Sequence, residues 1–228
     1  MSAATRAALQ VTVTAPVVSF RDPMYRGVQI TLPCPPPTTV GGLLAAAAGG
    51  WDFVKPELSF AMSFHARGRG SDLETYHPLD RSGAASSPAP RHRDFLADVT
   101  LRIWLFDDID LWRRRLRRPR WGLRLGRSQD LVGLRLDEVV VHAEPGVLGS
   151  ALVPETVTAT PASQRLRLAS AVVPGNTDTR WGSYRFDPTG RCDDVVPGSR
   201  STIDGQALVP LASPHPATIT ATSTAGDR

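Results

Sequence analysis

The chain has 228 residues, of which 41% are hydrophobic and 21% charged, as in folded proteins with one large domain or two small ones. No apolar run is as long as a membrane-spanning helix, and the segment MSAATRAALQ has no apolar signal-peptide core, so we expect a cytoplasmic protein that contacts no membrane. Cys34 and Cys192 have no ligand-type neighbours at metal spacing, which predicts free thiols, and we expect no metal and no cofactor.

Arginine carries almost all of the positive charge. The formal net charge is +4, and Lys55 is the only lysine. Residues 111–129 contain eight arginines and no acidic residue. Arginine binds phosphate bidentately and stacks on bases. This distribution predicts a polyanionic partner, although a run of arginines is also typical of a solvated helix face.

The first predicted elements are a strand and a short helix. Residues 9–18 alternate apolar and small polar side chains, which predicts a half-buried strand. Three prolines then precede Thr38 and Thr39, so we expect a threonine-capped helix from about residue 40 to 48, closed by two glycines. The free N–H groups of a helix start favour a phosphate or carboxylate there. Alternatively, the prolines only begin a structural helix.

The middle of the chain alternates between strand patterns and an irregular segment. Residues 58–65 and 95–106 are predicted strands. Between them, residues 66–93 are polar and rich in glycine and proline, and they are too long for an ordinary connection. This segment is either a disordered loop or a projecting arm that orders on a partner.

A second helix and a further strand complete this part of the chain. Three aspartates at 107, 108 and 110 are predicted to cap the helix, and Pro119 ends it. Residues 134–142 form the next predicted strand. The order β, α, β, arm, β, α, β predicts an α+β, ferredoxin-like domain of the RRM-like kind over residues 1–149. Residues 150–228 are then an irregular β-rich C-terminal extension packed on it, with a mobile tail of about thirty residues.

Three segments together resemble CRISPR-associated protein family five, of the RAMP superfamily. They are LQVTVTAPVVSFR, TLPCPPPTTVGGLLAAAAGG and RPRWGLRLGRSQDLVGL, which follow one another in the family's order. The resemblance covers about residues 9–142 and is closest to the I-B-like branch. It implies a RAMP domain whose segment 66–93 is an extended thumb.

The resemblance also implies a function and a set of contacts. Such proteins cap the five-prime handle of the CRISPR RNA in type I Cascade, where they contact the family-seven backbone subunits and the large, family-eight subunit, and they meet target DNA only indirectly. Trp121 is predicted to stack on a base, although a core or interface position is more usual for tryptophan. The residues expected to bind RNA are Arg21, Arg26, Thr38, Thr39, Gly41, Arg67, Arg69, Arg120, Arg127, Ser128 and Gln129.

Two other functions stay open. The first is a metal-independent endoribonuclease. The resemblance implies this activity for type I-C members of the family, which use a tyrosine with an adjacent lysine and histidine to cleave precursor CRISPR RNA. Here Lys55 is followed by Pro56, and no spacing links Tyr25 to His65, so we expect no catalytic residue and no enzyme activity. The second is a ferredoxin-like interaction module whose arginines are only solvated.

Overall fold

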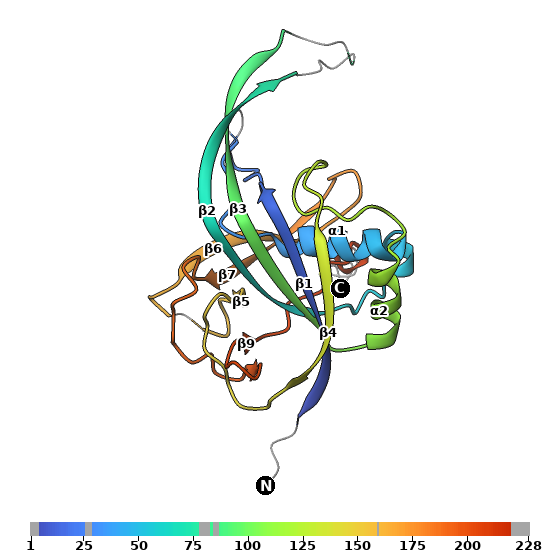
Figure 1. Cartoon of the computed structure of the whole chain (residues 1–228), viewed down its shortest axis with the longest axis vertical. Coiled ribbons are helices and arrows are strands. Elements are labelled where there is room, and N and C mark those ends of the chain that lie inside the picture. Colours follow the sequence, from blue (N-terminus) through green and yellow to red (C-terminus); the bar gives the residue numbers. More distant parts are fainter. Residues whose placement is uncertain (1–4, 26–28, 78–82, 84–86, 159, 220–228) are drawn as a thin grey trace, which may run out of the picture.

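A four-stranded antiparallel sheet carries the fold (Figure 1). The computed structural model describes residues 5–25, 29–77, 83, 87–158 and 160–219. The strands lie in the order β2-β3-β1-β4. In chain order the elements are β1 (Arg6–Val18), α1 (Pro37–Ala48), the 3₁₀ turn η1 (Trp51–Phe53), β2 (Phe60–Tyr76), β3 (Ala89–Leu105), α2 (Ile109–Arg117) and β4 (Gly133–Val141).

Alternation along β1 fixes which face of the sheet is covered. Leu9, Val11 and Val13 are fully buried and share one core with α1 and α2. Side chains on a strand point alternately to its two faces, so these residues place both helices on the same side of the sheet. The strands predicted at 9–18, 95–106 and 134–142 are confirmed. Trp104 lies on the other face in a smaller cluster and donates from Nε1 to Gln10 at 3.1 Å.

The described residues of the segment 66–93 largely form a β-hairpin, so of the two alternatives the disordered loop is wrong for them. β2 and β3 pair from Phe60↔Leu105 to Tyr76↔Ala89. The pairing of β1 with β3 stops at Val18↔Leu96, so the outer half of the hairpin extends beyond the sheet (Figure 1). Backbone pairing satisfies the peptide groups of this polar segment without a buried face. The tip, at residues 78–82 and 84–86, lies outside the described residues.

The start of α1 differs from the prediction. The helix begins at Pro37 with Pro36 as its N-cap, and neither threonine caps it. Proline suits the first helical position because the missing N–H has no partner there anyway. The amides of Thr39 and Val40 donate to the Pro36 carbonyl at 2.9 and 3.3 Å, so these two N–H groups of the helix start already have a partner within the chain. The predicted end is confirmed, with Gly49 at φ 103°.

The three aspartates at the start of α2 form ion pairs, and none caps the helix with a side-chain hydrogen bond. Asp108 occupies the N-cap position with no side-chain cap bond, and its carboxylate lies 2.7 Å from Nζ of Lys55. Asp107 pairs with Arg6, and Asp110 with Arg113. The predicted end before Pro119 is confirmed.

The C-terminal part packs on α1 and on β2. It contains β5 (Val153–Pro154), β6 (Gln164–Val172), β7 (Thr179–Phe186), β8 (Arg200–Ser201) and β9 (Ala207–Leu208). Leu168, Phe186 and Leu211 belong to the same core as the helices. Leu211 anchors the start of the predicted tail, because it is buried and its amide donates to the Phe60 carbonyl at 2.9 Å. No helix in the described part of the chain is long and apolar enough to cross a membrane.

Two neighbouring glycines of α1 provide a test of this packing. A Cβ at Gly41 would lie 2.5 Å from Cγ of Pro214, whereas a Cβ at Gly42 would meet nothing within 4 Å. We expect Gly41→Ala to lower the free energy of unfolding by about 1–3 kcal/mol through overpacking. Gly42→Ala is the matched control, and it should raise that free energy by about 0.5–1 kcal/mol. Urea unfolding measures both, and equal effects would contradict the packing of Pro214 on α1.

Candidate nucleic-acid interface

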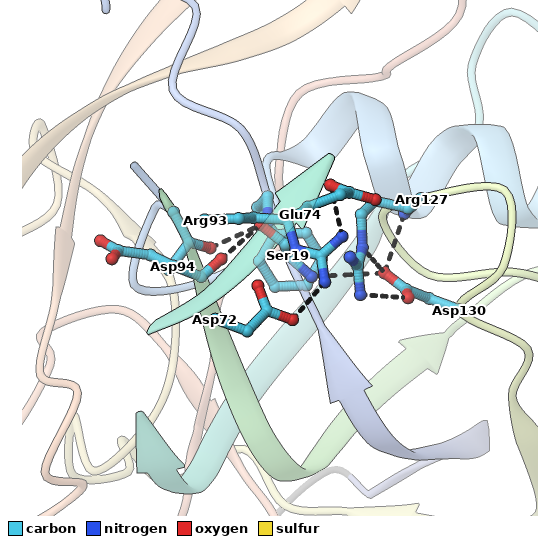
Figure 2. A network of polar contacts seen from close by, with 9 residues as sticks. Ser19, Asp72, Glu74, Arg93, Asp94, Arg127 and Asp130 are labelled. Atoms are coloured by element: carbon cyan, nitrogen blue, oxygen red, sulfur yellow. Dashed lines mark hydrogen bonds and ion pairs between the residues drawn. The ribbon is translucent and has the colours of Figure 1, made fainter. Parts of the chain in front are cut away.

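The carboxylate of Asp130 joins the end of β1 to the loop at residues 126–130. One Asp130 oxygen accepts the Ser19 amide at 3.3 Å, the Arg127 amide at 3.0 Å and Arg127 Nε at 3.0 Å, and the other accepts Arg127 Nη2 at 2.8 Å (Figure 2). Gly126, at φ 100°, lets the loop close, because a Cβ there would lie 2.6 Å from the Ser19 carbonyl oxygen. The first and third family-like segments therefore meet here.

The guanidinium of Arg127 forms a largely buried ion pair with Asp130. Its side chain is 21% exposed, and that of Asp130 is 3% exposed. A buried, bidentate pair of this kind is costly to break, because the carboxylate would be left without its partner. Two of the three guanidinium nitrogens of Arg127 are thus held by Asp130, and Nη1 is the one without a hydrogen-bond partner. RNA binding by Arg127 stays a prediction. Ser128 and Gln129 lie exposed at the tip of the loop.

The chain after β1 folds back on itself and exposes Arg21. Phe20 donates its amide to Oγ1 of Thr31 at 2.9 Å, and the Leu32 amide returns to the Phe20 carbonyl at 2.7 Å. Arg21 is exposed, and no ion pair holds its guanidinium within the described part of the chain. Arg26 lies outside the described residues.

Arg93 holds the base of the hairpin together. It stands opposite Asp72 in the β2–β3 register, pairs with Asp72 through Nη2, and has Nη1 2.6 Å from Glu74 (Figure 2). Partial burial lowers the pKa of Arg93, but the hydrogen bonds and charges of the two carboxylates outweigh this and raise the pKa above its ordinary value. Its side chain is 8% exposed. Arg93 is therefore a charged residue that fixes the hairpin.

A groove of about 440 Å³ lies beside this base and has arginines on its rim. We call it the hairpin-base groove. It is lined by Pro33, Phe64, Ala66, Arg67, Gly68, Arg69, Leu96, Gln164, Leu166 and Pro188. The second family-like segment enters it through Pro33, just before α1. Most of the other lining residues are apolar, so the groove has an apolar floor and a cationic rim.

Asp94 connects the groove with the Asp130 junction. Its carboxylate lies 2.8 Å from Nη2 of Arg69, and its carbonyl accepts Oγ of Ser19 at 2.8 Å. Arg67 pairs in the same way with Asp98 at 3.0 Å. The Arg69 and Arg67 side chains are 56% and 77% exposed. The groove, Arg21 and the 126–130 loop thus form one surface at the end of β1, which we call the β1-end surface.

Other predicted residues do not lie on this surface. Gly41 is buried against Pro214 and Trp51. Close packing therefore accounts for a glycine at this position, and RNA has no room at its Cα. Thr38 and Thr39 lie half-buried in the first turn of α1. Arg120 and Trp121 lie at the other end of α1, where their amides donate to the carbonyls of Ala47 and Ala46.

The residues considered for RNA cleavage do not form a catalytic group in the described part of the chain. Lys55 pairs with Asp108 at the start of α2. Tyr25 is half-exposed in the loop after β1, and His65 is exposed on β2 opposite Thr100. No hydrogen bond within that part joins any two of these three side chains.

Comparison with known proteins identifies the family. A model described as CRISPR-associated protein (Cas_Cas5) matches residues 8–196. The chain belongs to this Cas5 family. The match extends the resemblance of the three segments well beyond residue 142. None of the curated proteins matches the chain.

Solved structures support the same fold for this Cas5-family chain. A CRISPR RNA-guided surveillance complex contains a chain that is 18% identical, with 89% of this chain and 91% of that one covered and a TM-score of 0.52. A chain of the type III-B Cmr-beta complex bound to cognate target RNA and AMPPnP is 11% identical, with coverages of 82% and 85% and a TM-score of 0.54. A CRISPR protein from Archaeoglobus fulgidus is 14% identical, with coverages of 89% and 99% and a TM-score of 0.50.

Sequence reasoning missed Arg93 and Asp130. The sequence did contain a signal for Arg93. Asp72 and Glu74 are two residues apart in the first half of the segment 66–93, and Arg91 and Arg93 are two residues apart in its second half. Opposite charges at a spacing of two residues on neighbouring strands predict cross-strand ion pairs. Asp130 carried no such signal, because its importance depends on the Ser19 amide far away in the sequence.

The junction predicts a large effect of a small change. Asp130→Asn removes the charge that holds the buried guanidinium of Arg127, so we expect the free energy of unfolding to fall by about 3 kcal/mol. The matched control is Asp137→Asn, which breaks an exposed pair with Arg135 and should cost under about 1 kcal/mol. Urea unfolding distinguishes the two, and similar small effects would show that the junction is not structural.

Proposed function

We propose that this chain is a non-catalytic RNA-binding subunit of a type I CRISPR effector complex, in which it caps the five-prime handle of the CRISPR RNA. The observation that carries the proposal is the β1-end surface, where all three family-like segments converge beside a cationic groove. The family match supports the CRISPR context. The element order βαββαβ and the strand order β2-β3-β1-β4 support a ferredoxin-like, RAMP-type domain.

The strength of the ion pairs decides which arginines can bind RNA. Exposed pairs such as Arg67–Asp98 and Arg69–Asp94 contribute roughly 0–1 kcal/mol, so a phosphate can displace the carboxylate. Arg21 needs no displacement. The buried pair of Arg127 with Asp130 stays intact and keeps the loop in place, while Ser128 and Gln129 offer hydrogen bonds from its tip.

Single-stranded handle nucleotides fit the shape of the groove. Their sugars and bases can lie on the apolar floor, while their phosphates reach the arginine rim. The hairpin would then act as the thumb, with its outer half reaching a neighbouring backbone subunit of family seven. We assign the large, family-eight subunit to another face, and we assign contact with target DNA to the assembled complex.

The groove arginines provide the direct test. The double variant Arg67→Glu/Arg69→Glu, assembled with its partner subunits, should retain at least about tenfold less handle RNA at physiological salt, because two cationic contacts become repulsive. The matched control is Arg167→Glu, an exposed arginine on β6. Sequencing of the five-prime ends of co-purified RNA measures retention, and wild-type retention by the double variant would contradict the handle site.

The proposal also predicts that the isolated chain leaves RNA intact. Incubation of the chain with an end-labelled repeat RNA in the presence of a chelator should give no cleavage product on a gel. In the assembled complex, Tyr25→Phe and His65→Ala should leave the amount of co-purified RNA unchanged. Cutting at one position that His65→Ala abolishes would favour the endoribonuclease function instead.

A further inference from the structure

Two exposed aromatic side chains and an arginine cover the glycine pair at the end of α1. A Cβ at Gly49 would lie 3.2 Å from Cγ of Arg120 and 3.7 Å from the ring of Phe53, and a Cβ at Gly50 would lie 3.9 Å from the ring of Trp121. Phe53 is 60% exposed and Trp121 56% exposed. We call Phe53, Arg120 and Trp121 the α1-end platform.

The backbone holds the platform in place. The amides of Arg120 and Trp121 donate to the last carbonyls of α1, those of Ala47 and Ala46, at 3.2 and 3.3 Å. Pro119 restricts the chain just before them. Aromatic rings that are both exposed and fixed lose little conformational entropy when a flat partner stacks on them.

Unpaired arginines flank the platform along the chain. Within the described residues, five arginines between 114 and 124 have no ion pair or side-chain hydrogen bond: Arg114, Arg117, Arg118, Arg120 and Arg124. No carboxylate occurs between Asp110 and Asp130. By contrast, Arg67, Arg69 and Arg93 at the hairpin base have carboxylate partners. The α2 end is therefore where this chain concentrates uncompensated positive charge.

The platform is separate from the β1-end surface. α1 has 12 residues, so its two ends lie roughly 18 Å apart at 1.5 Å per residue. Pro33, which lines the hairpin-base groove, precedes the start of this helix, whereas the platform lies on its end. A strand held at the groove would leave the platform open.

We propose that the α1-end platform and the α2 arginines form a second binding surface, for single-stranded nucleic acid. Exposed bases would stack on Trp121 and Phe53, and the phosphates would lie along the arginines. Regularly spaced phosphates match an extended set of unpaired arginines better than the mixed charges of a protein surface do. Stacking and phosphate contacts do not read the 2′-hydroxyl, so RNA and DNA share the required chemistry. This surface does not depend on the proposed handle site.

Tryptophan fluorescence of the full-length chain tests the proposal. Trp121 is the exposed tryptophan among the five, all of which are described, so stacking of a base on it should quench the emission. We would titrate the chain with oligo-uridylate and with oligo-deoxythymidylate. Quenching by either supports the surface, and the tighter of the two identifies the kind of strand. Heparin, which has charge but no bases, should bind without quenching.

Variants separate stacking from charge. Trp121→Ala should weaken oligonucleotide binding about tenfold, whereas Trp121→Phe should keep the affinity and lose the quench. Arg117→Ala/Arg118→Ala should lower the slope of log affinity against log salt by about 0.7 for each phosphate that the variant no longer neutralises. The controls are Ile203→Ala, which truncates another exposed apolar side chain, and Arg167→Ala, and both should bind as the wild type does.

Two results would overturn the proposal. If neither oligonucleotide quenches the emission, the platform does not stack bases and is better explained as a protein-docking surface. If Arg67→Ala/Arg69→Ala abolishes the quench, the platform is not a separate site. Failure of the handle-site proposal alone would look different, because the groove double variant would then retain handle RNA while oligonucleotides still quench the Trp121 emission.

Discussion

The structure at the end of the sheet depends on one carboxylate. Asp130 accepts hydrogen bonds from the end of β1 and from three N–H groups of Arg127, so it closes a five-residue loop and anchors it at once. Gly126 makes the closure possible, since any side chain there would meet the Ser19 carbonyl. The exposed tip and the exposed arginine after β1 take their positions from this junction.

A division between buried and exposed ion pairs follows along the same surface. Arg127 is largely buried together with Asp130 and stabilises the loop, whereas Arg93 is buried beside two partly exposed carboxylates and stabilises the hairpin. Arg67 and Arg69 pair in solvent, where screening makes the pairs weak, and so they stay available to a polyanion. The same residue type thus serves as scaffold or as ligand according to how far water is excluded from it.

The sequence predicted the elements that have one buried face. Alternation found β1, β4 and the inner half of β3, and the glycine pair located the end of α1. It failed where both faces are in solvent, because residues 66–76 show no apolar period and their strand depends on pairing with the second half of the hairpin. The sequence also predicted Arg120 and Thr38 together as RNA-binding residues. In the structure they lie at opposite ends of α1, because a sequence motif does not show at which end of a distant helix a residue packs.

Photo-cross-linking tests the handle-binding account most directly. A guide RNA with a photoreactive nucleotide in its five-prime handle would be assembled with this chain and its partner subunits, irradiated and analysed by mass spectrometry. The account predicts cross-links to the loop after β1, to the hairpin-base groove and to the 126–130 loop. Handle cross-links confined to β5–β9, or to other subunits alone, would contradict it.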